Sequence, residues 1–107
     1  MNGCEAREQG EYLIVAVSGE VDLSWSSEVR GAILDALGKN NAVLVELEKV
    51  SYIDSSGIAA LVEGYQTAKS KGAKFGLVSI SGAVQAVLEL ARLDQVFPIY
   101  ADVQAAG

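Results

Sequence analysis

Residues 50–69, VSYIDSSGIAALVEGYQTAK, place a carboxylate, two hydroxyls and a glycine in succession at the start of a helical pattern. One interpretation is a helix N-cap, in which Asp54 or a serine accepts from the first helical N–H groups and Gly57 permits close packing. The other is a phosphorylation site, because the N–H groups and dipole at a helix N-terminus tolerate a phosphate dianion. Such a phosphate adds about −1.5 to −2 charges, so a docked partner would feel it most. The residue pattern alone leaves both interpretations open.

The remaining reactive residues argue against catalysis. The chain has no histidine, which removes the usual general base, a common zinc ligand and every Ser–His or Cys–His nucleophile. Cys4 is the only cysteine, so neither an internal disulfide nor a thiolate metal cluster can form. We find no P-loop, no Gly-x-Gly-x-x-Gly motif and no metal-ligand spacing. We therefore predict a protein that is not an enzyme and uses no metal or cofactor. A sensor or enzyme for a small molecule or nucleotide is the least favoured hypothesis.

The charge of the chain is acidic and unevenly distributed. Residues 1–65 hold eleven acidic and four basic residues, a balance of −7, whereas residues 66–107 hold three and four, a balance of +1. An acidic surface repels phosphates, so nucleic acid is not expected as a partner. The charge would attract a basic protein surface, or it could serve only to keep the protein dispersed in water. No apolar run of about 18 residues and no N-terminal signal pattern is present, so we expect a cytoplasmic protein without membrane contact.

The periodicity of apolar residues predicts a single α/β domain over residues 1–107. Strands are expected at 11–18, 42–47, 74–80 and 96–100, with a weaker edge strand at 3–9. The strand at 96–100 is expected at an edge, because Pro98 cannot donate to a ladder. Between them lie three main helices: one after GEVDLS that Asp22 or Ser24 caps, one that ends at Gly72, and one that Ser81 caps. This β(β)αβαβαβ order predicts a mainly parallel sheet of four to five strands. The tail after Tyr100 is expected to fray.

Acidic and hydroxyl side chains cluster in the predicted loops that leave the carboxyl ends of these strands. The loops SGEVDLS and EKVSYIDSSG contain Glu20, Asp22, Glu48 and Asp54, and serines occur in both and in SISGA. Because the carboxyl ends of parallel strands meet at one edge, we expect these side chains to converge on an acidic rim. As a carboxylate pair on one strand face, Glu46 and Glu48 are interpreted as solvated or edge-facing charge rather than as a metal or catalytic site.

Three segments together resemble the STAS domain of bacterial anti-sigma-factor antagonists. They are GEVDLS, VSYIDSSGIAALVEGY and KGAKFGLVSISGAVQAVLELARLDQVFPIY, and the resemblance covers residues 11–100. Its most specific part is the Asp–Ser–Ser–Gly–aliphatic pattern at the start of the second helix. The turn Gly–Glu–apolar–Asp and the run Leu–Asp–x–x–Phe near the end support it.

The resemblance implies a protein that switches partners when it is phosphorylated. In that family the unphosphorylated antagonist binds an anti-sigma factor that is also a serine kinase, and this binding frees the sigma factor. Phosphorylation of the first hydroxyl residue after the aspartate, here Ser55, ends the interaction, and a serine phosphatase reverses it. Asp54, Ser56 and Gly57 would then shape the docking site, with Glu20 and Asp22 on the adjacent loop.

The same family offers an alternative. Some STAS domains are constitutive subunits of phospholipid-transport ATPase complexes, in which the domain holds an ATPase and needs no phosphorylation. This chain also departs from the family pattern at Ala59, where many relatives carry glycine, and in a C-terminal helix that is almost absent. These departures concern the outer edge of the fold rather than the switch.

Overall fold

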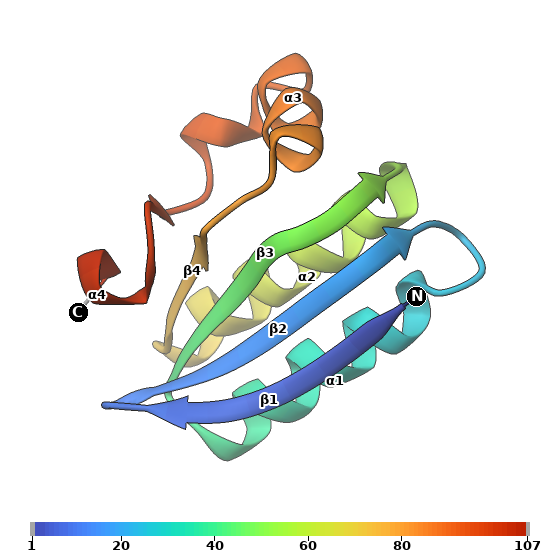
Figure 1. Ribbon diagram of the computed structural model, residues 1–107. Helices are drawn as coiled ribbons and strands as arrows, with labels where there is room; N and C mark the ends of the chain where they lie inside the picture. The colour runs from blue at the N-terminus through green and yellow to red at the C-terminus, as the bar shows by residue number, and fades with distance from the viewer. Residues whose placement is uncertain (1, 107) are drawn as a thin grey trace.

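A five-stranded sheet forms the centre of the protein (Figure 1). The computed structural model describes residues 2–106. The strands lie in the sheet in chain order: β1 (Gly3–Gln9), β2 (Tyr12–Val21), β3 (Ala42–Ile53), β4 (Lys74–Val78) and β5 (Ile99–Tyr100). β1 pairs antiparallel with β2, and every other neighbouring pair is parallel. The predicted mainly parallel α/β sheet and its edge strand at 3–9 are therefore confirmed.

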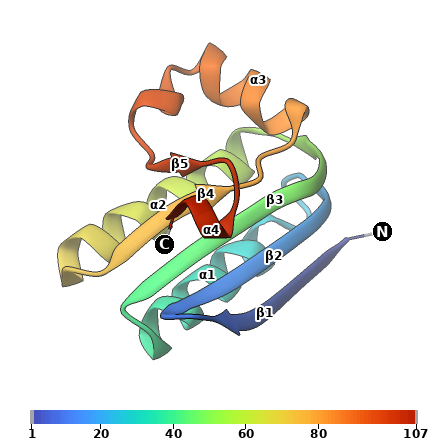
Figure 2. The same ribbon diagram turned by 60° about the vertical axis from the view of Figure 1, so that its left-hand side comes forward.

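The three predicted helices are present, together with two short helical segments. They are α1 (Ser26–Lys39), α2 (Ser55–Lys71), α3 (Gly82–Leu90), the 3-10 turn η1 (Leu93–Gln95) and α4 (Val103–Ala106). α1 and α2 run side by side across one face of the sheet, whereas α4 lies against the opposite face (Figure 2). Within residues 2–106, no helix has the length and apolar character needed to cross a membrane.

The main hydrophobic core lies between the sheet and the pair α1 and α2. Val29, Ile33 and Leu37 of α1, which are four positions apart, are at most 1% exposed. On α2, Gly64 lies so close to Ile33 and the ring of Phe75 that a Cβ atom would approach Ile33 Cγ2 to 2.6 Å. Gly64 thus allows α2 to pack closely inside the domain.

β3 is twice as long as predicted, and two irregularities explain why its second half was missed. Relative to β2, β3 gains one extra residue between Glu46 and Lys49 and another between Val50 and Tyr52. Each such bulge places two residues opposite one and shifts the alternation of side chains between the two faces. The β3 residues that enter the main core are therefore two positions apart from Val43 to Leu47 and three positions apart afterwards, at Val50 and Ile53. A search for strict alternation reads this second half as a loop.

Two predictions about the ends of elements were wrong. α1 begins at Ser26, and neither Asp22 nor Ser24 caps it through a side chain. Asp22 instead closes a turn before the helix, in which its Oδ1 accepts from Ser24 N at 3.0 Å and its carbonyl accepts from Ser26 N. The tail after Tyr100 forms α4, and the Tyr12 hydroxyl donates to the Ala106 carbonyl at 2.9 Å.

Candidate functional site

Asp54 caps α2, as its position before the helical pattern predicts. Its Oδ1 atom accepts from the backbone N–H of Ser56 at 2.9 Å and from that of Gly57 at 3.2 Å. The Ser56 hydroxyl donates to the same oxygen at 2.5 Å. One carboxylate therefore satisfies two of the N–H groups that a helix start leaves without a partner, and it also fixes the Ser56 side chain.

These hydrogen bonds stabilise the ionised form of the Asp54 carboxyl group. They lower the pKa of Asp54 below its ordinary value: the hydroxyl of Ser56 has the largest effect, and the N–H groups of Gly57, Ser56 and Leu23 add to it. Partial burial works in the opposite direction and is outweighed. Donors that point at a carboxylate favour its ionised form. The cap is consequently negative at neutral pH.

Ser55 differs from both of its neighbours. It is the first residue of α2 and is exposed, and within residues 2–106 its hydroxyl takes no part in the hydrogen bonds of the cap. Since Asp54 and Ser56 complete the cap, an added group on Ser55 would not remove a hydrogen bond from it. The two interpretations of the Asp–Ser–Ser sequence are therefore compatible, because capping and accessibility fall on different residues.

The loop between β2 and α1 lies beside this helix start. The backbone N–H of Asp54 donates to the Val21 carbonyl at 3.2 Å, and Glu20 pairs with Tyr52 in the sheet register. Glu20 is exposed and Asp22 is half-buried. The structure thus brings Asp22 and Glu20 to the same edge of the sheet as Asp54, Ser55 and Ser56, although Glu20 belongs to β2 rather than to the predicted loop.

Gly57 is buried under this surface. A Cβ atom at this position would come within 2.6 Å of Ile53 Cγ1, 2.8 Å of Val21 Cγ1 and 3.0 Å of the Val21 carbonyl oxygen. Only glycine lets the first turn of α2 approach the ends of β2 and β3 this closely. Gly57 therefore positions the surface residues of the site from below.

Other predicted members of the rim lie elsewhere. Glu48 and Ser51 belong to β3 rather than to a loop, because the bulges extend that strand to Ile53. Glu48 is exposed on the open face of the sheet, and nearby Glu46 forms an ion pair with Arg7 at 3.0 Å, as expected for solvated or edge-facing charge. The rim is therefore smaller than predicted.

Two exposed apolar side chains complete the site and were not predicted. Leu23 is 78% exposed in the β2–α1 loop, and Tyr52 is 50% exposed two residues before Asp54. Leu23 stands between the polar residues Asp22 and Ser24, whereas Tyr52 stands among the buried residues Val50 and Ile53. The sequence therefore gives no separate signal for Tyr52 and only a weak one for Leu23, although large exposed apolar groups often mark contact surfaces.

The site combines polar and apolar groups at the surface. Among residues 2–106, no group of three or more His, Cys, Asp or Glu side chains is placed to hold a metal ion. The site provides an exposed alcohol, a negative cap and two apolar side chains on a rigid helix start. These features suit recognition by another protein.

Comparisons with known proteins give consistent matches. The family model of the STAS domain matches residues 4–106. The anti-sigma F factor antagonist of Paenibacillus polymyxa is 28% identical over 82% of this chain and 77% of its own length. The anti-sigma-B factor antagonist of Listeria monocytogenes is 24% identical over 83% of this chain and 79% of its own length. The crystal structure of an anti-sigma factor antagonist from Mycobacterium paratuberculosis superimposes with a TM-score of 0.88 at 25% identity, over 97% of this chain and 89% of that one.

Proposed function

This chain belongs to the STAS domain family, and we propose that its residues 1–107 act as one domain that is an anti-sigma-factor antagonist. Its unphosphorylated form binds an anti-sigma factor that is also a serine kinase, and so frees the sigma factor. Phosphorylation of Ser55 ends this binding. The exposed Ser55 hydroxyl, outside a cap that Asp54 and Ser56 complete, is the observation that carries the proposal.

The position of Ser55 explains how a modification could change binding without unfolding the domain. At the first residue of α2, a phosphate lies at the positive end of the helix dipole, which stabilises negative charge. The cap hydrogen bonds stay in place because none of them uses Ser55. The added charge instead joins Glu20, Asp22 and Asp54 and alters the surface that a partner meets.

The surface around Ser55 defines the partner by its chemistry. Acidic groups at Glu20 and Asp22 favour a basic contact surface, and the exposed Leu23 and Tyr52 offer apolar anchors of the kind that dominate binding energy. The proposed switch requires that the cost of desolvating a phosphate beside these apolar anchors exceed its attraction to the basic groups of the partner. Ser56 and Gly57 contribute by fixing the geometry of the helix start.

The proposed switch needs no catalytic residue from this chain. The kinase supplies ATP and its metal ion, and a serine phosphatase removes the phosphate and restores binding. The named relatives are antagonists, which are regulatory proteins, and this favours a non-enzymatic role here. Because the proposed partners control transcription, the proposed place of action is the cytoplasm.

Phosphate mapping tests the assignment to Ser55. The protein is incubated with its partner kinase and ATP, and the modified residue is identified by mass spectrometry. We expect one phosphate on Ser55, none on a Ser55→Ala variant, and normal incorporation in a Ser56→Ala variant. Phosphate at another residue, or equal incorporation into Ser55→Ala, would contradict the assignment.

The relatives do not favour the phospholipid-transport alternative, and an experiment in cells separates the two functions. A constitutive subunit needs the surface but not the hydroxyl, so Ser55→Ala would have no effect. For a switched antagonist, Ser55→Ala cannot be turned off, and the sigma factor should stay active in conditions that normally silence it. Unchanged sigma-dependent transcription in that variant would count against the switch.

A further inference from the structure

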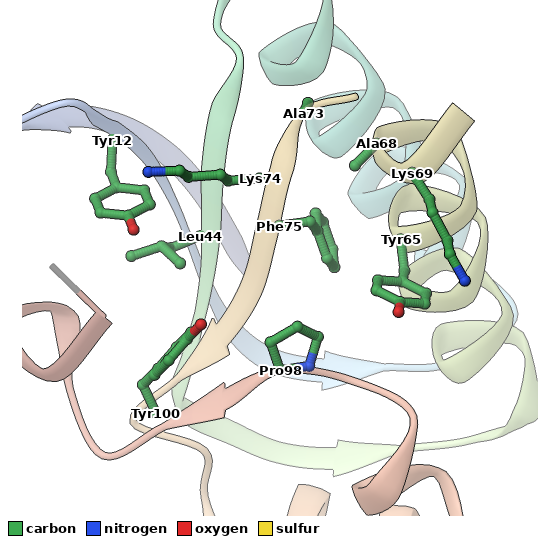
Figure 3. Close-up of a pocket in the computed structure, with 10 residues that line it drawn as sticks. All are labelled: Tyr12, Leu44, Tyr65, Ala68, Lys69, Ala73, Lys74, Phe75, Pro98 and Tyr100. Carbon is green, nitrogen blue, oxygen red and sulfur yellow. The ribbon is translucent and has the colours of Figure 1, made fainter. Parts of the chain in front are cut away.

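A second candidate site lies at the other end of α2. Lys69 follows Ser55 by 14 positions, which is about 21 Å along a helix axis. There a cavity of about 270 Å³ opens beside the edge of β4, between α2 and the segment that leads into β5 (Figure 3). Neither the cap of α2 nor the acidic rim contributes to it.

The cavity exists because β5 pairs with only the last part of β4. Leu77 N donates to the Pro98 carbonyl at 2.9 Å and Ser79 N donates to the Tyr100 carbonyl at 3.3 Å, so these two residues face β5. Lys74 N donates to Asn41 O, on the β3 side. The N–H and C=O groups of successive residues in a strand point to opposite neighbouring strands. Those of Phe75 therefore point to the same side as those of Leu77.

Pro98 prevents β5 from reaching Phe75. The next hydrogen bond of a parallel ladder would run from the N–H of residue 98 to the Phe75 carbonyl, but proline has no N–H. The residue before it, Phe97, donates its own N–H to Leu93 O at 3.2 Å. Within residues 2–106, the register pairs β5 with Leu77 and Val78 alone, so the N–H and C=O of Phe75 face the cavity without a partner strand.

The side chains around this open edge lie on both faces of β4. Tyr65 and Ala68 of α2 stand on one side, and Tyr12, Leu44 and Tyr100 stand on the other (Figure 3). An extended peptide that continues the sheet at Phe75 would place alternate side chains on these two sides and would supply both the donor and the acceptor that Phe75 lacks.

Of the residues that the structure describes, two lysines, Lys69 and Lys74, and no acidic residue line the cavity. Lys69 has no carboxylate partner among residues 2–106, and its Nζ lies 5.8 Å from the centroid of the Tyr65 ring. Lys74, which also lines the cavity, donates to Glu11 Oε2 at 2.8 Å. A free lysine beside aromatic rings favours a segment that carries acidic residues.

We propose that the edge of β4 at Phe75 is a binding site for a short, extended, acidic peptide segment of a partner protein. The peptide adds to the sheet at the point where Pro98 ends the β4–β5 ladder. Its backbone bonds Phe75, its apolar side chains enter the two halves of the cavity, and a carboxylate contacts Lys69. The site is independent of Ser55, so a partner can occupy it whether or not the helix start at the other end is modified.

The experiment titrates the protein with the synthetic peptide acetyl-Glu-Phe-Val-Glu-amide, followed by amide NMR. We expect saturable shifts at Lys74–Gly76 and slower hydrogen exchange of the Phe75 amide in the complex. The matched peptide acetyl-Lys-Phe-Val-Lys-amide should bind at least about tenfold more weakly, because a charge-assisted contact is lost. Lack of saturation up to about 1 mM, equal binding of both peptides, or shifts confined to residues 52–57 would overturn the proposal.

Four variants separate the features of the site. Lys69→Met should weaken binding about tenfold, whereas Lys49→Met, which removes the same charge from an exposed residue of β3, should not. Pro98→Ala restores an N–H that can pair with Phe75, and this should close the edge and weaken binding. Ser55→Asp should leave peptide binding unchanged, which keeps this test separate from the proposed switch. Equal weakening by Lys69→Met and Lys49→Met would show that only the net charge of the protein affects peptide binding, and would overturn the proposal.

Discussion

The two ends of α2 use the same helix in opposite ways. At the N-terminal end, Asp54 satisfies the first N–H groups and leaves the Ser55 hydroxyl exposed among acidic side chains. At the C-terminal end, Gly72 closes the helix in a left-handed conformation, and the nearby edge of β4 leaves the Phe75 peptide group without a partner strand among residues 2–106. The first end is complete in its backbone and suited to modification, whereas the second is incomplete and suited to an added strand. Hydrogen bonding, more than exposure, distinguishes the two kinds of surface.

The largest expected effect concerns the packing of atoms around the glycines at the two ends of α2. Gly57→Ala should destabilise the protein by about 1–3 kcal/mol, because its Cβ would overlap Ile53 and the Val21 carbonyl. Gly72→Ala at the other end meets no atom within 4 Å and should cost only the left-handed backbone, about 1–2 kcal/mol. Urea denaturation of both variants measures the difference. If Gly57→Ala were neutral, the close approach of α2 to β2 and β3 would be wrong.

The second prediction tests whether a negative charge at Ser55 weakens partner binding at the N-terminal end of α2. Ser55→Asp should weaken binding to the anti-sigma factor at least about tenfold, because a negative charge is desolvated in the contact. Its Tm should stay close to that of the unmodified protein, since Ser55 makes none of the cap hydrogen bonds. The neutral variant Ser55→Asn controls for size. A large loss of Tm in Ser55→Asp would indicate that Ser55 supports the cap after all.

The third prediction concerns the apolar part of the same surface. Leu23→Ala should reduce binding to the anti-sigma factor by about 1 kcal/mol or more, as expected for an exposed anchor that becomes buried in a contact. Leu90→Ala is the matched control, because Leu90 is even more exposed, at 89%, and lies on α3. Calorimetry with both variants measures the difference. Equal effects of the two variants would remove Leu23 from the proposed contact.

The smallest expected effect is a dependence of stability on pH. The pKa of Asp54 is lower in the folded protein than its ordinary value, so its contribution is fully present above the unfolded pKa. That contribution is lost as pH falls through the lowered folded value. Asp54→Asn should therefore unfold at a lower temperature than the unmodified protein at neutral pH, and the two should converge in strong acid.

A variant that leaves the carboxylate in place sharpens this test. Ser56→Ala removes the hydroxyl that lowers the pKa of Asp54 most, so the pKa should rise toward its ordinary value. An NMR titration of the Asp54 carboxyl measures the change. An unchanged pKa would show that the backbone N–H groups, and not the Ser56 hydroxyl, lower the pKa of Asp54.

Local chemistry made some features predictable from the sequence. Ser81 begins α3 and Gly72 ends α2 as predicted, and Asp54 is one of the candidate caps that the sequence offered for the start of α2, because a cap depends on neighbours within a few residues. The parallel sheet followed from the alternation of strands and helices. The contribution of the Asp–Ser–Ser–Gly sequence to the site could likewise be read from its place before a helical pattern.

Features that depend on pairing between distant strands were missed. The second half of β3 follows from its register against β2, and its burial pattern matches no single period. The exposure of Leu23 depends on where the turn of Asp22 directs the loop, and the sequence shows only an apolar residue near a buried strand. Pro98 was correctly placed at an edge, but which residue of β4 it leaves open required the structure.

The two bulges of β3 also limit how this protein can change. Each extra residue reverses which side chains point inward, and together they bring Ile53 into the core and Asp54 to the helix start. Loss of one residue between Leu47 and Ile53 would turn the following side chains to the opposite face, because alternation has a period of two. The length of this segment is therefore constrained more strictly than its composition: exposed positions such as Lys49 can be replaced, whereas a single deletion would misplace the serine that follows.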